Sequence, residues 1–187
     1  IEMVVTTNNT PPPPPPPPPP MSPLPHLPPL PPLPPRSPPP PPLLPIPAGE
    51  VLASTPQDIQ DVIDSCPLGG NARIYLRPGA HLRFTRLVFC QRYIHLSIRS
   101  SGEGATLDGG NVSSMFYFMT GCSVDLEALH FVDGRNAYKG GAVSTIEAGN
   151  VAMTNVSFTG CESEGVGGAV YEFDSGDISM VHVTFSE

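Results

Sequence analysis

The apolar positions in the C-terminal third of the chain repeat every 27 residues. Segments 123–131, 150–158 and 177–185 align so that four apolar columns come into register: Val124/Val151/Ile178, Leu126/Met153/Met180, Leu129/Val156/Val183 and Phe131/Phe158/Phe185. A second landmark moves by the same step, because Gly140-Gly141-Ala142-Val143 recurs as Gly167-Gly168-Ala169-Val170. Fixed self-similarity of this length is typical of a solenoid, in which each repeat buries its apolar face by stacking on its neighbours.

The spacing inside each repeat indicates strands. Apolar residues alternate at Val151 and Met153 and again at Val156 and Phe158, which is the two-residue period of a strand and not that of a helix. Gly-Gly pairs suit corners, where positive φ and close backbone approach cost little. The pattern therefore predicts an all-β fold, a right-handed parallel β-helix with about 27 residues per coil. Phe158 should be buried, and residues 152, 154 and 157 should face outward.

One helix is expected before the strands. Thr55 is a typical N-cap, Pro56 suits the first helical position, and Asp58 can cap the backbone as the acid three residues after Thr55. An apolar stripe follows, and the helix should end near Cys66. We expect this helix to cover the open end of the first coil. Short alternating segments between residues 73 and 118 suggest one irregular coil, which gives roughly four coils in all. Because the repeats stop two residues after Phe185, we expect a fragment of a longer protein.

Composition divides the chain into two parts. Of the 28 prolines, 25 lie between Pro11 and Pro47. Proline lacks an N–H donor and fixes φ, so this tract predicts a disordered polyproline stalk, residues 1–47, on the order of 110 Å long. Residues 48–187 then form the β-helix, and they are numerous enough for one core.

The net charge of −8 is unevenly distributed. Residues 65–100 contain six arginines and no carboxylate, whereas residues 101–187 contain twelve acids against Arg135 and Lys139. Two interpretations stay open: a solvated exterior, or a basic collar that meets an anionic polysaccharide through Arg83, Arg86 and Arg92. The sequence predicts no nucleic-acid partner, because the chain is acidic and has no basic recognition helix.

The remaining chemistry points outside the cell. The four cysteines, Cys66, Cys90, Cys122 and Cys161, fit no Cys-x-x-Cys metal pattern and indicate disulfides or buried thiols, with the pairing open. Sequons make Asn8, Asn111 and Asn155 glycosylation candidates in a secreted protein. No segment has the apolar length of a membrane span. The sequence predicts no cofactor and no metal centre.

The residues resemble a known superfamily. Ile74-Tyr75-Leu76-Arg77-Pro78-Gly79, the run from Ile94 to Gly109 and strands ending in Phe before Gly-Gly-Ala-Val resemble the pectin-lyase-like right-handed β-helices. The Gly-Gly-Ala-Val blocks are similar to polymorphic outer membrane protein repeats, although Gly134 and Cys161 stand where that family has asparagine. The Ser-Pro block at Ser37 resembles extensins. The resemblance implies a cell wall, a matrix or an outer surface.

A catalytic site is harder to find in this pattern. The repeat places Glu147 over Asp174, a pair that could hold a cation, or be two solvated turns. Histidines never stack on one another, and the signature blocks of polysaccharide lyases and glycoside hydrolases are missing. We therefore expect a non-enzymatic structural or adhesive protein. The alternatives are a fragment of such an enzyme, with its active coils beyond Glu187, and a carbohydrate-binding module.

Overall fold

The computed structural model describes residues 14, 17 and 45–187. Chain contacts separate residues 1–42 from Leu43–Glu187, and the description concerns the second unit. The predicted proline-rich stalk and the candidate glycosylation site Asn8 lie outside the described residues, apart from Pro14, Pro17 and the stalk's last three positions.

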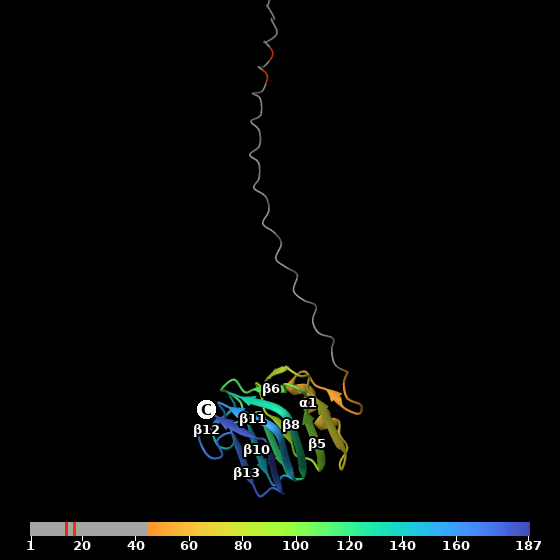
Figure 1. Cartoon of the computed structure of the whole chain (residues 1–187), viewed down its shortest axis with the longest axis vertical. Helices are drawn as coiled ribbons and strands as arrows, with labels where there is room; N and C mark the ends of the chain where they lie inside the picture. Colours follow the sequence, from red (N-terminus) through yellow and green to blue (C-terminus); the bar gives the residue numbers. More distant parts are fainter. Residues whose placement is uncertain (1–13, 15–16, 18–44) are drawn as a thin grey trace, which may run out of the picture. The chain divides into compact units, whose positions relative to one another are not determined.

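The folded unit is a parallel β-solenoid. Within residues 45–187 every paired strand runs parallel to its neighbour, and the strands form sheets of nine, four and two members (Figure 1). The nine-stranded sheet contains β1 Val51–Leu52, β2 Asn71–Tyr75, β3 His81–Arg83, β5 Ile94–Arg99, β6 Ala105–Asp108, β8 Cys122–Val132, β11 Val151–Thr159, β14 Ile178–Val181 and β15 Thr184–Ser186. The four-stranded sheet contains β4 Val88–Cys90, β7 Phe116–Met119, β10 Val143–Ile146 and β13 Val170–Phe173, and the two-stranded sheet contains β9 Arg135–Asn136 and β12 Glu162–Ser163.

The solenoid has about five turns, so the expectation of four coils was wrong. β2, β5, β8, β11 and β14 begin successive turns, and the region taken for one irregular coil contains two. From β8 onward neighbouring turns pair at a step of 27, as in Val151 with Val124. Earlier steps differ, because Asn71 pairs with His95 and Val88 with Phe116. The connections 84–87 and 109–115, of four and seven residues, differ in length between these two turns and hide the period there.

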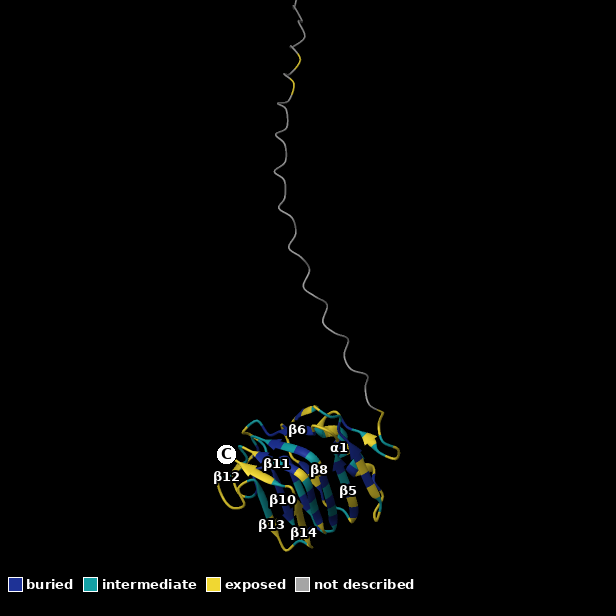
Figure 2. Cartoon of the chain, viewed as in Figure 1, coloured by how far each residue is buried: buried dark blue, intermediate teal, exposed yellow. Residues whose placement is uncertain are grey.

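The core is made by the predicted columns. Val124, Leu126, Leu129 and Phe131 of β8 pair in register with the corresponding residues of β11, and all are buried. The rings of Phe131 and Phe158 stack with their centroids 4.8 Å apart. Residues 152, 154 and 157 are partly exposed and lie on the outer face, which confirms the predicted alternation. Figure 2 shows buried segments alternating with more exposed ones along the strands of the solenoid.

The predicted helix is α1, Pro56–Ser65. Thr55 caps it, and Asp58 returns its carboxylate to the backbone amides of Ser54 and Thr55. Ile59 and Ile63 are fully buried against the first turn, which confirms the expected capping role. Gln60 adds a contact that the pattern did not suggest: its side-chain amide donates to the Phe89 carbonyl and accepts from the Phe89 N–H. Through these two bonds the helix replaces a missing neighbour strand beside β4.

The corners use left-handed backbone at regular places. Ala128, Asn155 and His182, 27 residues apart, have φ between 53° and 54° and divide the strands of the long sheet. Gly140 has φ +47°, and a side chain at Gly141 would collide with the Glu162 backbone of the next turn. The Gly-Gly pair is therefore required at this corner by both its conformation and its close packing.

Candidate functional site

The outer face of the four-stranded sheet is unusually apolar. In-register pairing stacks Phe89, Tyr117, Ser144 and Tyr171 in one column. A second column contains Met119, Ile146 and Phe173. We name these seven residues the aromatic face. Solvated strands normally direct polar side chains outward, so this face departs from the pattern of an inert surface.

Aromatic side chains on this face remain accessible. The rings of Phe89 and Tyr117 lie 5.7 Å apart, and the Lys139 ammonium lies 4.9 Å from the centre of the Tyr171 ring. Phe173 is 54% exposed. The two columns therefore present neighbouring aromatic rings and one cation, a combination that suits a ligand with both apolar and polar surface.

A hollow of about 200 Å³ lies beside the aromatic face. Its lining residues are Leu87, Tyr117, Asn136, Tyr138, Lys139 and Ser144. Tyr138 is 78% exposed, and the Ser144 hydroxyl donates to the Lys139 carbonyl at 2.9 Å. Small-molecule pockets are usually about 300–1,000 Å³, so the hollow accommodates one ring or side chain of a larger partner.

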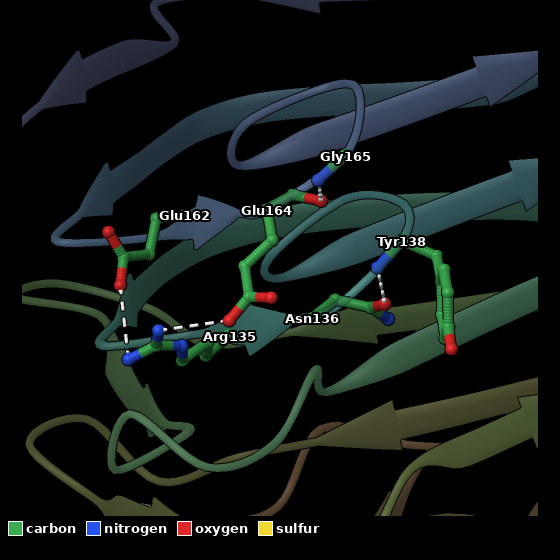
Figure 3. A network of polar contacts seen from close by, with 7 residues as sticks. Arg135, Asn136, Tyr138, Glu162, Glu164 and Gly165 are labelled. Atoms are coloured by element: carbon green, nitrogen blue, oxygen red, sulfur yellow. Dashed lines mark hydrogen bonds and ion pairs between the residues drawn. The ribbon is translucent and has the colours of Figure 1, made fainter.

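Stacked loops from two successive turns hold the rim of this hollow (Figure 3). The Arg135 guanidinium lies between two carboxylates, 3.5 Å from Glu162 and 3.1 Å from Glu164. The Asn136 side-chain oxygen accepts the backbone N–H groups of Tyr138, at 2.9 Å, and Lys139, at 3.2 Å. These bonds fix the backbone that carries Tyr138, so the rim is organised by contacts within the chain.

The chemistry of the lining favours binding. It offers two phenols, an amide, a hydroxyl and an ammonium, and none of its six residues is a carboxylate. General acid and base catalysis by paired carboxylates needs two such groups beside the substrate. None of the six lining residues supplies that pair.

The three arginines predicted to meet an anionic polymer lie in the first turn. Arg83, on β3, is 3.3 Å from Asp108, and Arg92 donates to the Asp64 carbonyl at the end of α1. Arg86 is exposed and takes part in none of the ion pairs of residues 45–187. Two of the three thus have partners inside the molecule, and the polymer hypothesis stays a prediction.

The predicted acidic pair occupies exposed turns. Glu147 and Asp174 follow the paired strands β10 and β13 and have φ of 51° and 52°. The Glu147 carboxylate accepts a bond from the Thr120 hydroxyl at 3.4 Å. In the described part of the chain no three His, Cys, Asp or Glu residues gather as metal ligands would.

The cysteines and sequons are placed as follows. Cys90 and Cys122 form a disulfide, and Cys66 and Cys161 are free thiols. Burial raises the pKa of the Cys161 thiol. Asn111 and Asn155 are both exposed and both adopt positive φ. Among the residues described, no helix has the length and hydropathy needed to cross a membrane.

The sequence contained a signal for the aromatic face. Tyr117 and Tyr171 are two repeats apart, and each lies at an outward position between two inward-facing residues of its strand. The hollow had no such signal, because Leu87 and Tyr138 reach it from loops whose course depends on the fold.

Comparison of the sequence with family models, of the chain with curated proteins, and of the fold with solved structures found no match. The structure itself places the chain among the parallel β-solenoid proteins, with an exposed aromatic face as its candidate site.

Proposed function

We propose that this chain is a secreted or cell-surface β-solenoid with a structural and adhesive role in a cell wall, an extracellular matrix or an outer surface. The aromatic face carries the proposal. Exposed apolar patches on a protein surface mark interaction sites, and this face combines the exposed rings of Phe89 and Phe173 with the partly exposed rings of Tyr117 and Tyr171.

Two further features support a place outside the cell. The Cys90–Cys122 disulfide suits an oxidising compartment. The proline-rich sequence of residues 11–47 suits an extensin-like spacer. We also assign the solenoid to the pectin-lyase-like type with polymorphic outer membrane protein-type repeats. Cys161 supports this assignment, because its sulfur accepts the Gly134 N–H of the preceding turn at 3.4 Å, a bond that an asparagine at this position could also make.

A carbohydrate-binding module is the second candidate. The hollow favours it, because Tyr117 and Tyr138 offer ring faces while Asn136 and Lys139 offer hydrogen-bond donors. An anionic polysaccharide would in addition engage the ammonium of Lys139 and the arginines of the first turn.

Retention of the labelled full chain on coated surfaces tests the proposal. The coatings are a polygalacturonate-type polymer, a neutral glucan and bare support. We expect retention on at least one coating, reduced roughly fivefold by the joint change Tyr117→Ser and Tyr138→Ser, because both rings leave the site. Leu68→Ser removes an exposed apolar side chain elsewhere and serves as the control.

A separate variant tests the arginines. Salt screens the attraction between charges that lie more than about 10 Å apart at 0.1 M ionic strength, so binding of the polymer by arginines should weaken as salt is added. If Arg83, Arg86 and Arg92 bind the anionic polymer, their joint change to Ser should abolish this salt-sensitive part of the retention. Retention on no coating, or equal retention by the tyrosine variant and the control, contradicts the proposed role of the aromatic face.

A further inference from the structure

The tyrosines of the aromatic face recur at every second turn. Tyr117 on β7 and Tyr171 on β13 belong to one outward column, and the smaller Ser144 on β10 lies between them. Neighbouring strands of a sheet lie about 4.8 Å apart, so the two tyrosine positions are separated by about 9.6 Å along the solenoid. A ligand that lies along the column from the second turn to the fourth therefore meets aromatic rings at this spacing.

The proline-rich sequence has nearly the same period. Leucine recurs at every third residue from Leu24 to Leu33, and residues 27–35 read Leu-Pro-Pro three times. Proline favours the polyproline II helix, which has three residues per turn and rises about 9.3 Å in each turn. Leucines three residues apart lie on one face of such a helix, at a spacing within about 0.3 Å of that between the two tyrosines.

We infer that the aromatic face binds the Leu-Pro-Pro segment, residues 27–35, of a second copy of this chain. This inference rests on the adhesive role proposed above and names the partner. One leucine enters the hollow beside Tyr117 and Tyr138, and the leucine three residues later contacts Tyr171. Aromatic-lined grooves recognise proline-rich segments in this way, because a polyproline II helix is largely formed before it binds and loses little entropy.

The hydrogen-bonding groups of the site match such a segment. Proline has no N–H, so a run of Leu-Pro-Pro offers mainly carbonyl acceptors. The Asn136 side-chain oxygen already accepts the backbone N–H groups of Tyr138 and Lys139, which leaves the Asn136 amide N–H groups as donors (Figure 3). The Lys139 ammonium, 4.9 Å from the centre of the Tyr171 ring, is a second donor. The site thus presents donors to a ligand that has mainly acceptors.

The charges of the site also suit an uncharged segment. Lys139 is the one charged residue among the six that line the hollow, and its ammonium already interacts with the Tyr171 ring. The nearby Arg135 guanidinium is paired with Glu162 and Glu164. An anionic polymer would therefore meet a single ammonium along this lining, whereas a neutral Leu-Pro-Pro segment needs no cation.

The contact is small, so we expect weak binding. About two leucines and the prolines between them enter the site, and the Kd should be on the order of 100 µM. The segment of one copy binds the face of another, so the contact is heterologous and can continue from copy to copy. Many copies held on one surface would strengthen the attachment through multivalency.

A synthetic peptide with the sequence of residues 27–35 tests the site on the full chain. Fluorescence anisotropy of the labelled peptide should show saturable binding, weakened roughly tenfold by the joint change Tyr117→Ser and Tyr171→Ser and unchanged by Leu68→Ser, an exposed control. The matched control peptide has the same composition with its three leucines consecutive, so that they no longer share one face. It should bind at least fivefold more weakly, on the order of the loss of one leucine contact.

Mixing two variants of the full chain tests whether the segment comes from another copy. The segment variant changes Leu27, Leu30 and Leu33 to Ser, and the face variant is Tyr117→Ser with Tyr171→Ser. In sedimentation velocity the wild-type chain should associate progressively between about 10 µM and 1 mM, and each variant alone should stay monomeric. Their equimolar mixture should form heterodimers, because one partner keeps the face and the other keeps the segment.

Three outcomes overturn the inference. The first is no binding of the peptide at 1 mM, and the second is equal binding of the peptide and its control. The third is a mixture of the two variants without heterodimers, which would exclude a segment from another copy. A chain that binds neither peptide but is retained on a coated surface keeps the adhesive role with a glycan as the partner, whereas failure in both assays removes both proposals.

Discussion

At the scale of single residues, the core columns carry most of the specificity of the fold. Phe131, Phe158 and Phe185 stack with centroid separations of 4.8 and 5.0 Å. Identical rings at this spacing stack directly on one another inside successive turns, and they fix the register of each turn on the next.

Replacement of Phe158 by Ala should lower the free energy of unfolding by about 3–5 kcal/mol, because it removes a fully buried ring and leaves a cavity between two turns. Urea denaturation of the full chain measures this change. Phe185→Ala is the matched control in the same column, and we expect it to cost much less because Phe185 is 56% exposed. Equal losses for the two variants would contradict the assignment of the core.

The apolar pattern predicted this column but not the corner inside it. The step from Met153 to Val156 is three residues instead of two, a break in the alternation whose meaning the sequence did not show. Asn155 occupies that break with positive φ, and Ala128 and His182 do the same in neighbouring turns. Asparagine and histidine tolerate left-handed backbone better than most residues, whereas alanine does not, so at Ala128 the coil geometry imposes the corner.

At the scale of elements, α1 was predictable because its signals are local. The capping box lies within four residues, and the backbone N–H of Ser54, above all, holds the pKa of Asp58 below its usual range. A lowered carboxyl pKa contributes stability above the unfolded pKa, so this small contribution is lost as the pH falls through the lowered pKa. The contact of Gln60 with β4 was not predictable, since it joins residues 29 apart.

Gln60→Ala should reduce the free energy of unfolding by about 1 kcal/mol, because two bonds to the exposed edge of β4 are exchanged for bonds to water. Gln57→Ala is the control, since Gln57 lies on the same helix and bonds only to Asp61 within residues 45–187. Chemical denaturation of both variants gives the comparison. If the two variants lose the same stability, the substitute-strand role of Gln60 is wrong.

At the scale of the whole molecule, the solenoid is built from contacts between neighbouring turns. The 27-residue step predicted which residues meet along β8 and β11, but the first two turns have unequal loops and were counted as one. The aromatic face and its hollow follow from the same stacking. They combine strands and loops from several turns, so they became visible only when every turn had its place.

The disulfide links turns of the solenoid that strand pairing does not join directly. Cys90 ends the first turn and Cys122 begins the third, 32 residues later, and both are fully buried. Closing a loop of this length stabilises a fold by roughly 3–4 kcal/mol in the chain-entropy account. Because strand pairing joins each turn only to its neighbours, the effect should concentrate in the first three turns, which the bond spans.

Joint replacement of Cys90 and Cys122 by Ala should therefore increase amide hydrogen exchange in β2, β5 and β7 more than in β11 and β13. Hydrogen-exchange mass spectrometry of the full chain measures this difference, with the Cys66→Ala variant as a control that leaves the disulfide intact. A reductant should reproduce the pattern in the wild-type chain and have no effect on the double variant. Uniform loss of protection along all five turns would show that the solenoid unfolds as one cooperative unit, and it would contradict the local action of the disulfide.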